Sequence, residues 1–191
     1  MQNLIADIKN VIPVQDNDLH KIISRFKEYA FKKKEAISSI GRVAGHFQFI
    51  ASGLVRVYFL DTDAREVTVQ IGIGGMWINN LYSFLNQSPS QFHIEVLADT
   101  TILQISKKDL EQSFEETPKM ETFFRLKVQH AYCRLQDRTI NQLNVPAKER
   151  YLELRKNYGE IESLVPQYII ASYLNISPEH LSKIRNQLAK G

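Results

Sequence analysis

Hydrophobic residues divide the sequence into two parts with different periodicities. Between residues 29 and 106, β-branched and aromatic residues form short runs that partly alternate with polar residues, a pattern typical of β-strands. The predicted strands are HFQFIASG, LVRVYFL, EVTVQIGI, FHIEVLA and TTILQIS. Turn signals such as Gly45, Gly53 and Asp99 with Thr100 separate them. Because these connections are too short for helical crossovers, the pattern predicts an antiparallel β-roll or jelly roll.

Helical periodicity precedes and follows the predicted strands. Asp16 is expected to cap a short amphipathic helix, and Ser106 to cap another with the sequence KKDLEQSF. Thr117 and Pro118 have the types preferred at the N-cap and first position of a helix. The helix that they open is predicted to run to about Leu143, a length of roughly 40 Å at 1.5 Å per residue.

This long helix carries apolar residues on more than one face. One stripe consists of Met120, Phe124, Val128, Ala131 and Leu135, and the other of Phe123, Leu126, His130, Cys133, Ile140 and Leu143. We expect one face to pack on the β-roll and the other on the same helix of a second chain, in a parallel dimer. The alternative is a helix that is wholly buried within one monomer.

The stretch IASYLNISPEHLSKIRNQL, residues 170–188, is predicted to form a helix-turn-helix rather than one helix. It follows a break at Asn144, Val145 and Pro146, where proline ends the long helix. Asn175 tolerates the left-handed backbone of a tight turn, and Ser177 with Pro178 restarts a helix. The apolar contacts between the two helices are assigned to Ile170, Leu174, Ile176, Leu181 and Ile184, with Ala171 as the small residue.

Polar side chains of the second helix are the candidate DNA-binding residues. They are hydroxyl, acidic, imidazole and basic groups, the types that contact base edges and phosphates. The candidates are Ser177, Glu179, His180, Ser182, Lys183 and Arg185. A solvated helix surface has a similar composition, so the inference depends on the turn and its flanking residues.

Three segments in this order resemble the Crp/Fnr family of bacterial transcription regulators. They are FIASGLVRVYFLDTDAREVTVQIGIGGMWI, VLADTTILQISKKDLEQ and IASYLNISPEHLSKIR. The resemblance implies an α+β fold with a cyclic-nucleotide-binding-like β-roll in residues 1–116, a dimerisation helix in 117–144 and a helix-turn-helix domain in 145–191. It also implies a homodimer that reads a pseudo-palindromic site in double-stranded DNA, with recognition helices about 34 Å apart. A cytoplasmic location is expected because the sequence has no apolar run long enough to span a membrane, and its start lacks the pattern of a secretion signal.

The same resemblance assigns roles to residues of the second helix. Glu179 and Lys183 match the acidic and basic pair with which family members read bases, and Ser177 matches a residue that contacts a phosphate. The family often has arginine at the positions of Pro178 and Lys183, so base preference does not carry over. RNA polymerase and an unidentified small-molecule effector are further partner hypotheses.

Ligand control is where the sequence departs from the family. Members that bind cyclic nucleotides carry a Gly-Glu-Leu element and an Arg-Ser or Arg-Ala element, whereas the corresponding stretches here read WINNLYSF and SPSQFHIE. A buried cyclic phosphate without a cationic partner is costly to desolvate, so we expect no tight cyclic AMP binding and no cofactor. The candidate residues for another effector's pocket are Trp77, Asn79, Asn80, Gln91 and His93. The alternative for them is a filled core.

Composition narrows the remaining classes. Residues 1–116 hold 12 Lys/Arg and 14 Asp/Glu, whereas residues 117–191 hold 12 and 7, a basic excess compatible with a polyanion partner. The single cysteine, Cys133, is insufficient for an internal disulfide or a cysteine-bound metal. We predict neither a membrane span, a metal site nor an enzyme, since no matching apolar run or catalytic motif is present. The rival function is a β-roll ligand-binding or scaffolding module whose last helices contact proteins.

Overall fold

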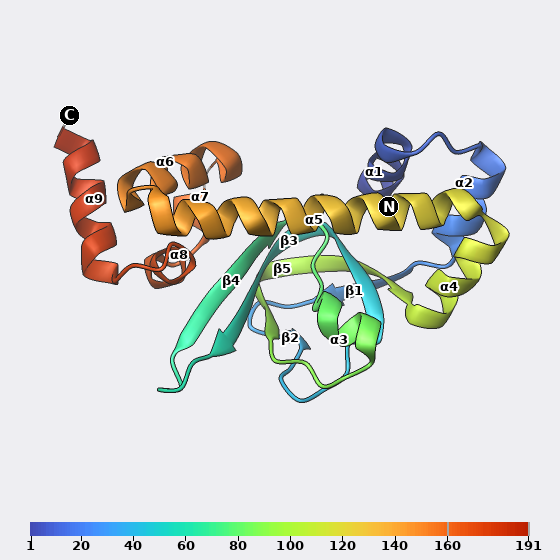
Figure 1. Cartoon of the computed structure of the whole chain (residues 1–191), viewed down its shortest axis with the longest axis horizontal. Coiled ribbons are helices and arrows are strands. Elements are labelled where there is room, and N and C mark those ends of the chain that lie inside the picture. The colour runs from blue at the N-terminus through green and yellow to red at the C-terminus, as the bar shows by residue number, and fades with distance from the viewer. Residues whose placement is uncertain (160, 191) are drawn as a thin grey trace. The chain divides into compact units, whose positions relative to one another are not determined.

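The computed structural model describes residues 1–159 and 161–190, apart from the side chain of the last of these (Figure 1). The chain forms two compact units. The first comprises Met1–Val57 and Ile71–His130, and the second Tyr58–Gln70 and Ala131–Gly191. The expected domain limits at 116/117 and 144/145 coincide with the ends of helices, whereas the compact units divide the long helix between them.

The β-rich part is one five-stranded sheet in the order β1-β5-β3-β4, with β2 paired to β5 (Figure 1). The strands are β1 (Lys27–Phe31), β2 (Ala36–Ser38), β3 (His46–Leu60), β4 (Glu66–Ile73) and β5 (His93–Ser106). β1 and β2 both run antiparallel to β5. The predicted antiparallel β-roll is confirmed, but four of the predicted strands are halves of the two long strands β3 and β5, and β1 and β2 were both missed.

Two predicted turn signals lie inside these long strands because they let the strands approach closely. Gly53, in β3, has a φ of 104°, and a Cβ atom there would lie 2.3 Å from the Thr100 Oγ1 atom of β5. The Thr100 hydroxyl accepts a hydrogen bond from the Leu54 N–H at 3.0 Å and donates one to the Ala98 carbonyl at 2.6 Å. Glycine and threonine therefore fit a close approach of the neighbouring strands β3 and β5, and the prediction of turns at these two places was wrong.

Helices of the first unit are α1 (Gln2–Val11), α2 (Asp16–Ser24), α3 (Leu81–Asn86), α4 (Lys107–Glu116) and the first half of α5 (Pro118–Asn144). The predicted cap of α4 is confirmed, because the Ser106 hydroxyl accepts from the Asp109 N–H at 3.0 Å. α5 begins at Pro118, as predicted. Asp16 is not the cap of α2: it is the first residue inside the helix, where its carboxylate favours the helix dipole and pairs with Lys9 at 3.0 Å.

Aromatic side chains fill the core between the helices and the sheet of the first unit. The Trp77 ring stacks on Phe47 at 4.6 Å and meets Phe49 and Phe123 edge-on. Its indole N–H donates to the Asp7 carboxylate of α1 at 2.7 Å, and the other oxygen of that carboxylate pairs with Lys127 of α5 at 2.8 Å. The polar edge of Trp77 is thus satisfied within the core.

The second unit contains α6 (Ala147–Tyr158), α7 (Ile161–Leu164), α8 (Gln167–Tyr173) and α9 (Pro178–Lys190). α8, the turn and α9 form the predicted helix-turn-helix (Figure 1). Its core consists of buried aliphatic side chains and one tyrosine from all four helices: Tyr151, Leu154, Ile161, Val165, Ile169, Ile170, Ala171, Leu174, Leu181 and Ile184.

Candidate functional site

The turn between α8 and α9 has the geometry that its sequence predicts. Asn175 adopts a left-handed backbone with a φ of 53°, which asparagine tolerates better than most residues. The N–H of Ile176 donates to the Ala171 carbonyl at 3.0 Å, which closes the end of α8. The Ser177 hydroxyl accepts from the His180 N–H at 3.2 Å and so caps α9. The turn fixes the direction in which α9 leaves α8.

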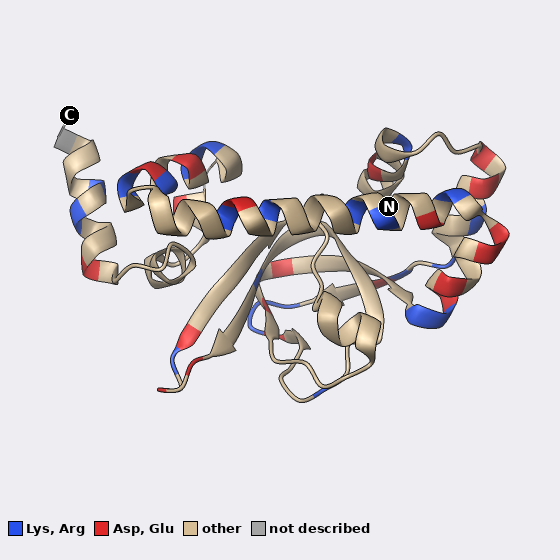
Figure 2. Cartoon of the chain, in the orientation of Figure 1, with Lys and Arg blue, Asp and Glu red and all other residues tan. Residues whose placement is uncertain are grey.

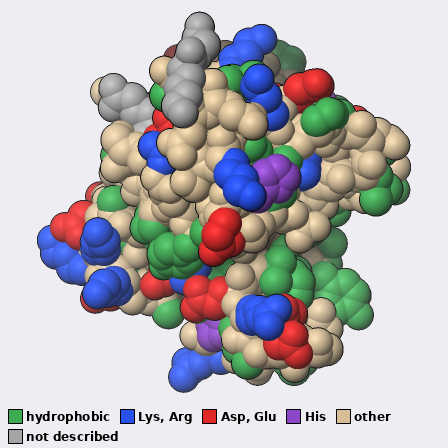
Figure 3. All heavy atoms as spheres, turned by 90° about the vertical axis from the view of Figure 1, so that its left-hand side faces the viewer, with side chains coloured by type: hydrophobic (Ala, Val, Ile, Leu, Met, Phe, Trp, Pro, Cys, Tyr) green, Lys and Arg blue, Asp and Glu red, His purple; other side chains and the backbone are tan. Residues whose placement is uncertain are grey.

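Five of the six candidate DNA-binding side chains are exposed on one helix and its cap. They are Ser177, Glu179, His180, Ser182 and Lys183. α9 carries an acidic residue at its start and basic residues further along (Figure 2). At this end of the molecule, basic, acidic and histidine side chains lie near one another on the surface (Figure 3). The helix therefore offers mixed hydrogen-bonding groups rather than charge of a single sign.

Arg185, the sixth candidate, has a different environment. Its side chain is half-buried, and its Nε atom lies 3.4 Å from a carboxylate oxygen of Glu162 in α7. Residues 181, 184 and 188 of α9 face the core, and Arg185 lies beside this row on the helical wheel. The spacing of apolar residues placed Arg185 outside the core but did not reveal its ion pair.

Glu179 is ionised more readily than an ordinary glutamate. The pKa of its carboxyl is lowered by hydrogen bonds from its own backbone N–H and from the Ser177 hydroxyl, and by the positive charge of Lys183. A carboxylate at this place accepts hydrogen bonds, as the amino group of cytosine can donate them. The cap of α9 and its acidic residue therefore form one hydrogen-bonded group.

Two arginines hold α8 in the second unit. Arg150 of α6 donates to the Leu174 carbonyl at the end of α8 at 2.6 Å, and to the Val145 carbonyl at 3.1 Å. Arg138 of α5 donates to the Tyr173 carbonyl at 2.9 Å and stacks on the Tyr173 ring, with 4.1 Å between the guanidinium carbon and the ring centroid. Both cations bind carbonyls in the last turn of α8, where the helix dipole is negative.

The β3–β4 hairpin, residues 58–70, belongs to the same unit and contacts α8. The Ser172 hydroxyl accepts from the Thr68 N–H at 2.9 Å and donates to the Glu66 carbonyl at 3.1 Å. Arg138 also donates to the Val69 carbonyl. The first helix of the helix-turn-helix is thus anchored to a β-hairpin more than 100 residues earlier in the chain.

The five residues predicted to line an effector pocket belong to the first unit, and three of them contact its other residues. Trp77 belongs to the aromatic core, and Asn79 accepts from the Gln48 N–H at 2.8 Å. The buried side chain of Asn80 caps α3 by accepting from the Ser83 N–H at 3.1 Å, and donates to the Ser90 hydroxyl at 2.6 Å. Gln91 is exposed and His93 is half-buried. The core alternative holds for Trp77, and a pocket lined by the others stays a prediction.

Sequence reasoning missed a buried cation in the sheet. Arg56 of β3 is only 4% exposed, and its Nε atom lies 2.7 Å from a carboxylate oxygen of Glu95 in β5. An arginine in a strand of alternating pattern is expected to face solvent. Its acidic partner comes beside it only when the two strands pair. The pair places two opposite charges in the sheet where the sequence suggested an apolar interior.

Apolar side chains of α5 divide into a buried and an exposed set. Met120 and Phe123 are buried in the first unit. The exposed fractions of Leu135, Ile140 and Leu143 are 59%, 55% and 79%, respectively. A helix wholly buried within one monomer is therefore excluded.

Two further predictions concern absences. Among the described residues, no three His, Cys, Asp or Glu side chains are grouped closely enough to hold a metal ion, and Cys133 is a free, exposed thiol. Within the same part of the chain, none of the helices combines the length and hydropathy of a membrane span.

Known proteins resemble the chain at two levels, a family model for the β-rich part and solved structures for most of the chain. Residues 28–117 match the family model of the cyclic nucleotide-binding domain. No curated protein sequence matches the chain. Solved structures of bacterial regulators match both the β-rich part and the helices that follow it. The chain has the fold of the Crp/Fnr regulators.

Three of these Crp/Fnr structures illustrate the likeness. The c-di-GMP-responsive global regulator CLP of Xanthomonas campestris is 12% identical, with a TM-score of 0.73 and coverage of 92% of each chain. FixK2 of Bradyrhizobium japonicum is 20% identical, with a TM-score of 0.72 over 86% of this chain and 85% of its own. A CooA mutant of Carboxydothermus hydrogenoformans is 20% identical, with a TM-score of 0.69 over 97% and 84%. The predicted fold is thereby confirmed.

Proposed function

We propose that this protein is a DNA-binding transcription regulator that reads a pseudo-palindromic site as a homodimer. The observation that carries the proposal is the pair of exposed side chains, Glu179 and Lys183, one turn apart on α9 behind a left-handed turn at Asn175. The similar solved structures are of regulators, which supports the same role. The match to the cyclic nucleotide-binding domain supports a regulatory rather than an enzymatic role for the β-roll.

Glu179 and Lys183 are suited to read bases in the major groove. A carboxylate accepts from the amino group of cytosine, and a lysine donates to guanine or to a phosphate. Ser177, at the start of α9, would contact a phosphate, as residues at helix N-termini often do. His180 and Ser182 flank this pair, whereas Arg185, held by Glu162, has a smaller part in DNA contact.

Dimerisation is assigned to the second half of α5. Leu135, Ile140 and Leu143 give this helix an exposed apolar surface that a second copy would cover. A twofold axis along the helix pair would set two copies of α9 about one DNA turn apart, roughly 34 Å. RNA polymerase is a further partner hypothesis for such a regulator.

Regulation by cyclic AMP is not part of the proposal. The polar side chains of Asn80 and Ser90 are used in hydrogen bonds with each other and with their neighbours, and both are buried. The buried cation Arg56 has a carboxylate partner in Glu95. One similar structure is of a c-di-GMP-responsive regulator, so c-di-GMP and cyclic AMP are the two ligands to assay by calorimetry. Micromolar cyclic AMP binding would contradict the proposal on this point.

Selection from random double-stranded DNA tests the main function. We expect enrichment of a twofold-symmetric site, and binding that weakens steeply as salt increases. Glu179→Ala combined with Lys183→Ala should abolish enrichment. Glu149→Ala combined with Lys148→Ala is the matched control, because it removes the same charges from exposed positions on α6. Enrichment of no symmetric site would favour the rival scaffolding module.

A further inference from the structure

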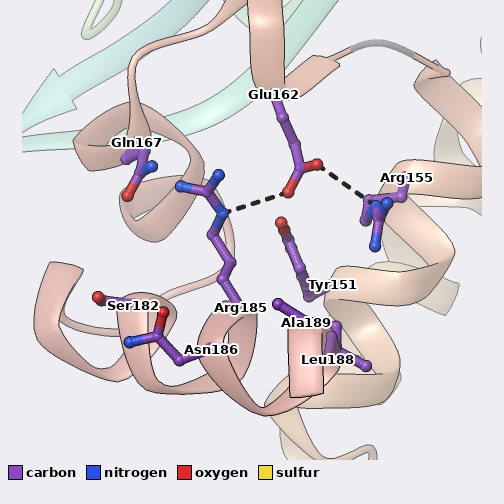
Figure 4. Close-up of a pocket in the computed structure, with 9 residues that line it drawn as sticks. All are labelled: Tyr151, Arg155, Glu162, Gln167, Ser182, Arg185, Asn186, Leu188 and Ala189. Carbon is purple, nitrogen blue, oxygen red and sulfur yellow. Dashed lines mark ion pairs between the residues drawn. The ribbon is translucent and has the colours of Figure 1, made fainter. Parts of the chain in front are cut away.

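A pocket of about 410 Å³ lies in the second unit beside α9 (Figure 4). Its walls come from α6, α7, α9 and the start of α8. Most of the lining side chains are polar or charged, among them Tyr151, Arg155, Glu162, Gln167, Arg185 and Asn186. Ligand pockets in proteins commonly have volumes of about 300–1,000 Å³, so this pocket can hold a small molecule rather than a single ion.

The Tyr151 hydroxyl is the first sign that a ligand belongs here. Tyr151 is 1% exposed, and its hydroxyl has no hydrogen-bond partner among the described residues. In Figure 4 its side chain points toward the carboxylate of Glu162 at the centre of the pocket. A buried hydroxyl without a hydrogen-bond partner destabilises the folded protein, so such groups generally have a function or an absent partner.

The ion pairs beside this hydroxyl contain two positive charges and one negative charge. The two oxygens of Glu162 lie 3.5 Å from Arg155 Nε and 3.4 Å from Arg185 Nε (Figure 4). Two guanidiniums thus share one carboxylate. Each guanidinium carries five N–H donors in a planar fork, both ion pairs are long, and both arginine side chains are partly exposed, so donors are accessible to a ligand beside Glu162.

We propose that this pocket binds a small organic anion that also carries hydroxyl groups, of the sugar phosphate class. Its oxyanion would accept from the guanidinium N–H groups of Arg155 and Arg185 that do not face Glu162, because arginine recognises phosphate oxygens in pairs. The Tyr151 hydroxyl would donate to the same oxyanion. Glu162 repels a bare anion but accepts hydrogen bonds from ligand hydroxyls, and it therefore favours a hydroxylated anion over inorganic phosphate.

The site goes beyond the proposed function, because it requires neither DNA nor a dimer. A DNA backbone phosphate is the other source of the same chemistry. The pocket, at about 410 Å³, is larger than one phosphate group, so a free small molecule fills it better than a backbone phosphate does. Because Arg185 and Asn186 belong to α9, an occupied site would contact the helix that is proposed to read bases.

Titration of the full chain, without DNA, tests the site. Glucose 6-phosphate, inorganic phosphate and glucose are added separately while amide resonances of α6, α7 and α9 are followed by NMR. We expect saturable binding of glucose 6-phosphate, at least about tenfold weaker binding of phosphate and none of glucose. Absence of saturable binding by either phosphate compound up to about 10 mM would overturn the proposal, and would leave the DNA-binding proposal untouched.

Substitutions distinguish the pocket from a nonspecific basic surface. Tyr151→Phe should weaken glucose 6-phosphate binding by about tenfold or more, because one hydrogen bond to an anion is lost. The same change should not lower the melting temperature, since it removes only an unpartnered hydroxyl. Arg155→Gln should also weaken binding, whereas Lys156→Gln, the same charge change at an exposed neighbour outside the pocket, should not.

Two outcomes contradict the assignment. Unchanged affinity in Tyr151→Phe would show that the ligand does not reach the buried hydroxyl. A fourth titration, with random-sequence duplex DNA, separates the two sources of phosphate. If DNA alone perturbs the pocket resonances, the pocket is part of the DNA surface and the proposal of a small-molecule site fails.

Discussion

The Arg138 guanidinium lies 4.1 Å from the centre of the Tyr173 ring and donates to the Tyr173 carbonyl at 2.9 Å. These two residues are 35 positions apart, one on the long helix α5 and the other at the end of α8. Burial lowers the pKa of Arg138, although arginine keeps its charge in proteins. A partly buried cation therefore joins α5 to the first helix of the helix-turn-helix.

We expect Arg138→Gln to destabilise the protein by about 2–4 kcal/mol. The change removes hydrogen bonds to the Tyr173 and Val69 carbonyls and the stacking on the tyrosine ring. Urea unfolding followed by circular dichroism measures the effect. Arg134→Gln, an exposed position one turn earlier in α5, should change stability by less than about 0.5 kcal/mol. Equal effects of the two changes would refute a structural role for Arg138.

Ser172→Ala should loosen the β3–β4 hairpin. The Thr68 N–H loses its acceptor, and the Glu66 carbonyl loses its donor, at a cost of about 1–2 kcal/mol. Hydrogen exchange of the Thr68 amide should accelerate by about tenfold or more. Ser182→Ala, at an exposed position of α9, should leave that amide unchanged. Exchange at the wild-type rate in Ser172→Ala would contradict the prediction.

Tyr158 should make stability sensitive to alkaline pH. Burial raises the pKa of its phenol, and the neighbouring Tyr173 raises it further. A raised pKa in the folded state favours the neutral phenol. Its stabilising contribution is therefore present below the unfolded pKa of about 10 and is lost as the pH rises above that value.

Unfolding free energies measured between about pH 8 and pH 11 test this sign. The decline with pH should be less steep in Tyr158→Phe than in the wild type. Tyr82→Phe is the control, because Tyr82 is 69% exposed and should leave the slope unchanged. A steeper decline in Tyr158→Phe would reverse the sign and refute the argument.

Gly53→Ala should be strongly destabilising, by about 3 kcal/mol or more. The added Cβ atom would lie 2.3 Å from the Thr100 Oγ1 atom and 2.5 Å from its Cα atom, and φ is 104°. Gly74→Ala should cost less than about 1 kcal/mol, since the nearest atoms there lie at 3.4 Å. Thermal unfolding compares the stability of the two variants. A similar loss of stability in both would show that β3 and β5 can move apart to accommodate the added Cβ atom.

The helix-turn-helix was predictable because its determinants are local. Asn175 at the turn, the Ser177 cap and the spacing of Leu181 and Ile184 lie within ten residues of one another. The same holds for the Ser106 cap and for the start of α5 at Pro118. In each case a short-range hydrogen bond or steric restriction selects a residue type, so the feature can be predicted from the local sequence.

Features that depend on residues far apart in the sequence could not be predicted in this way. Gly53 has the sequence signature of a turn, but its role depends on Thr100 in another strand. The partner of Arg56 is Glu95, and that of Ser172 is a backbone 104 residues away at Thr68. The Tyr151 pocket needs four helices in place before its hydroxyl becomes buried. Only the tertiary structure pairs these groups.

The contact between Ser172 and the hairpin also covers part of the sheet edge. β4 lies at one end of the sheet order, where exposed N–H and C=O groups can recruit a strand from another molecule. One serine hydroxyl occupies both the Thr68 N–H and the Glu66 carbonyl. A helix side chain thus occupies two backbone groups that an added strand would need. Loss of this contact would free both groups for pairing with a strand of another molecule.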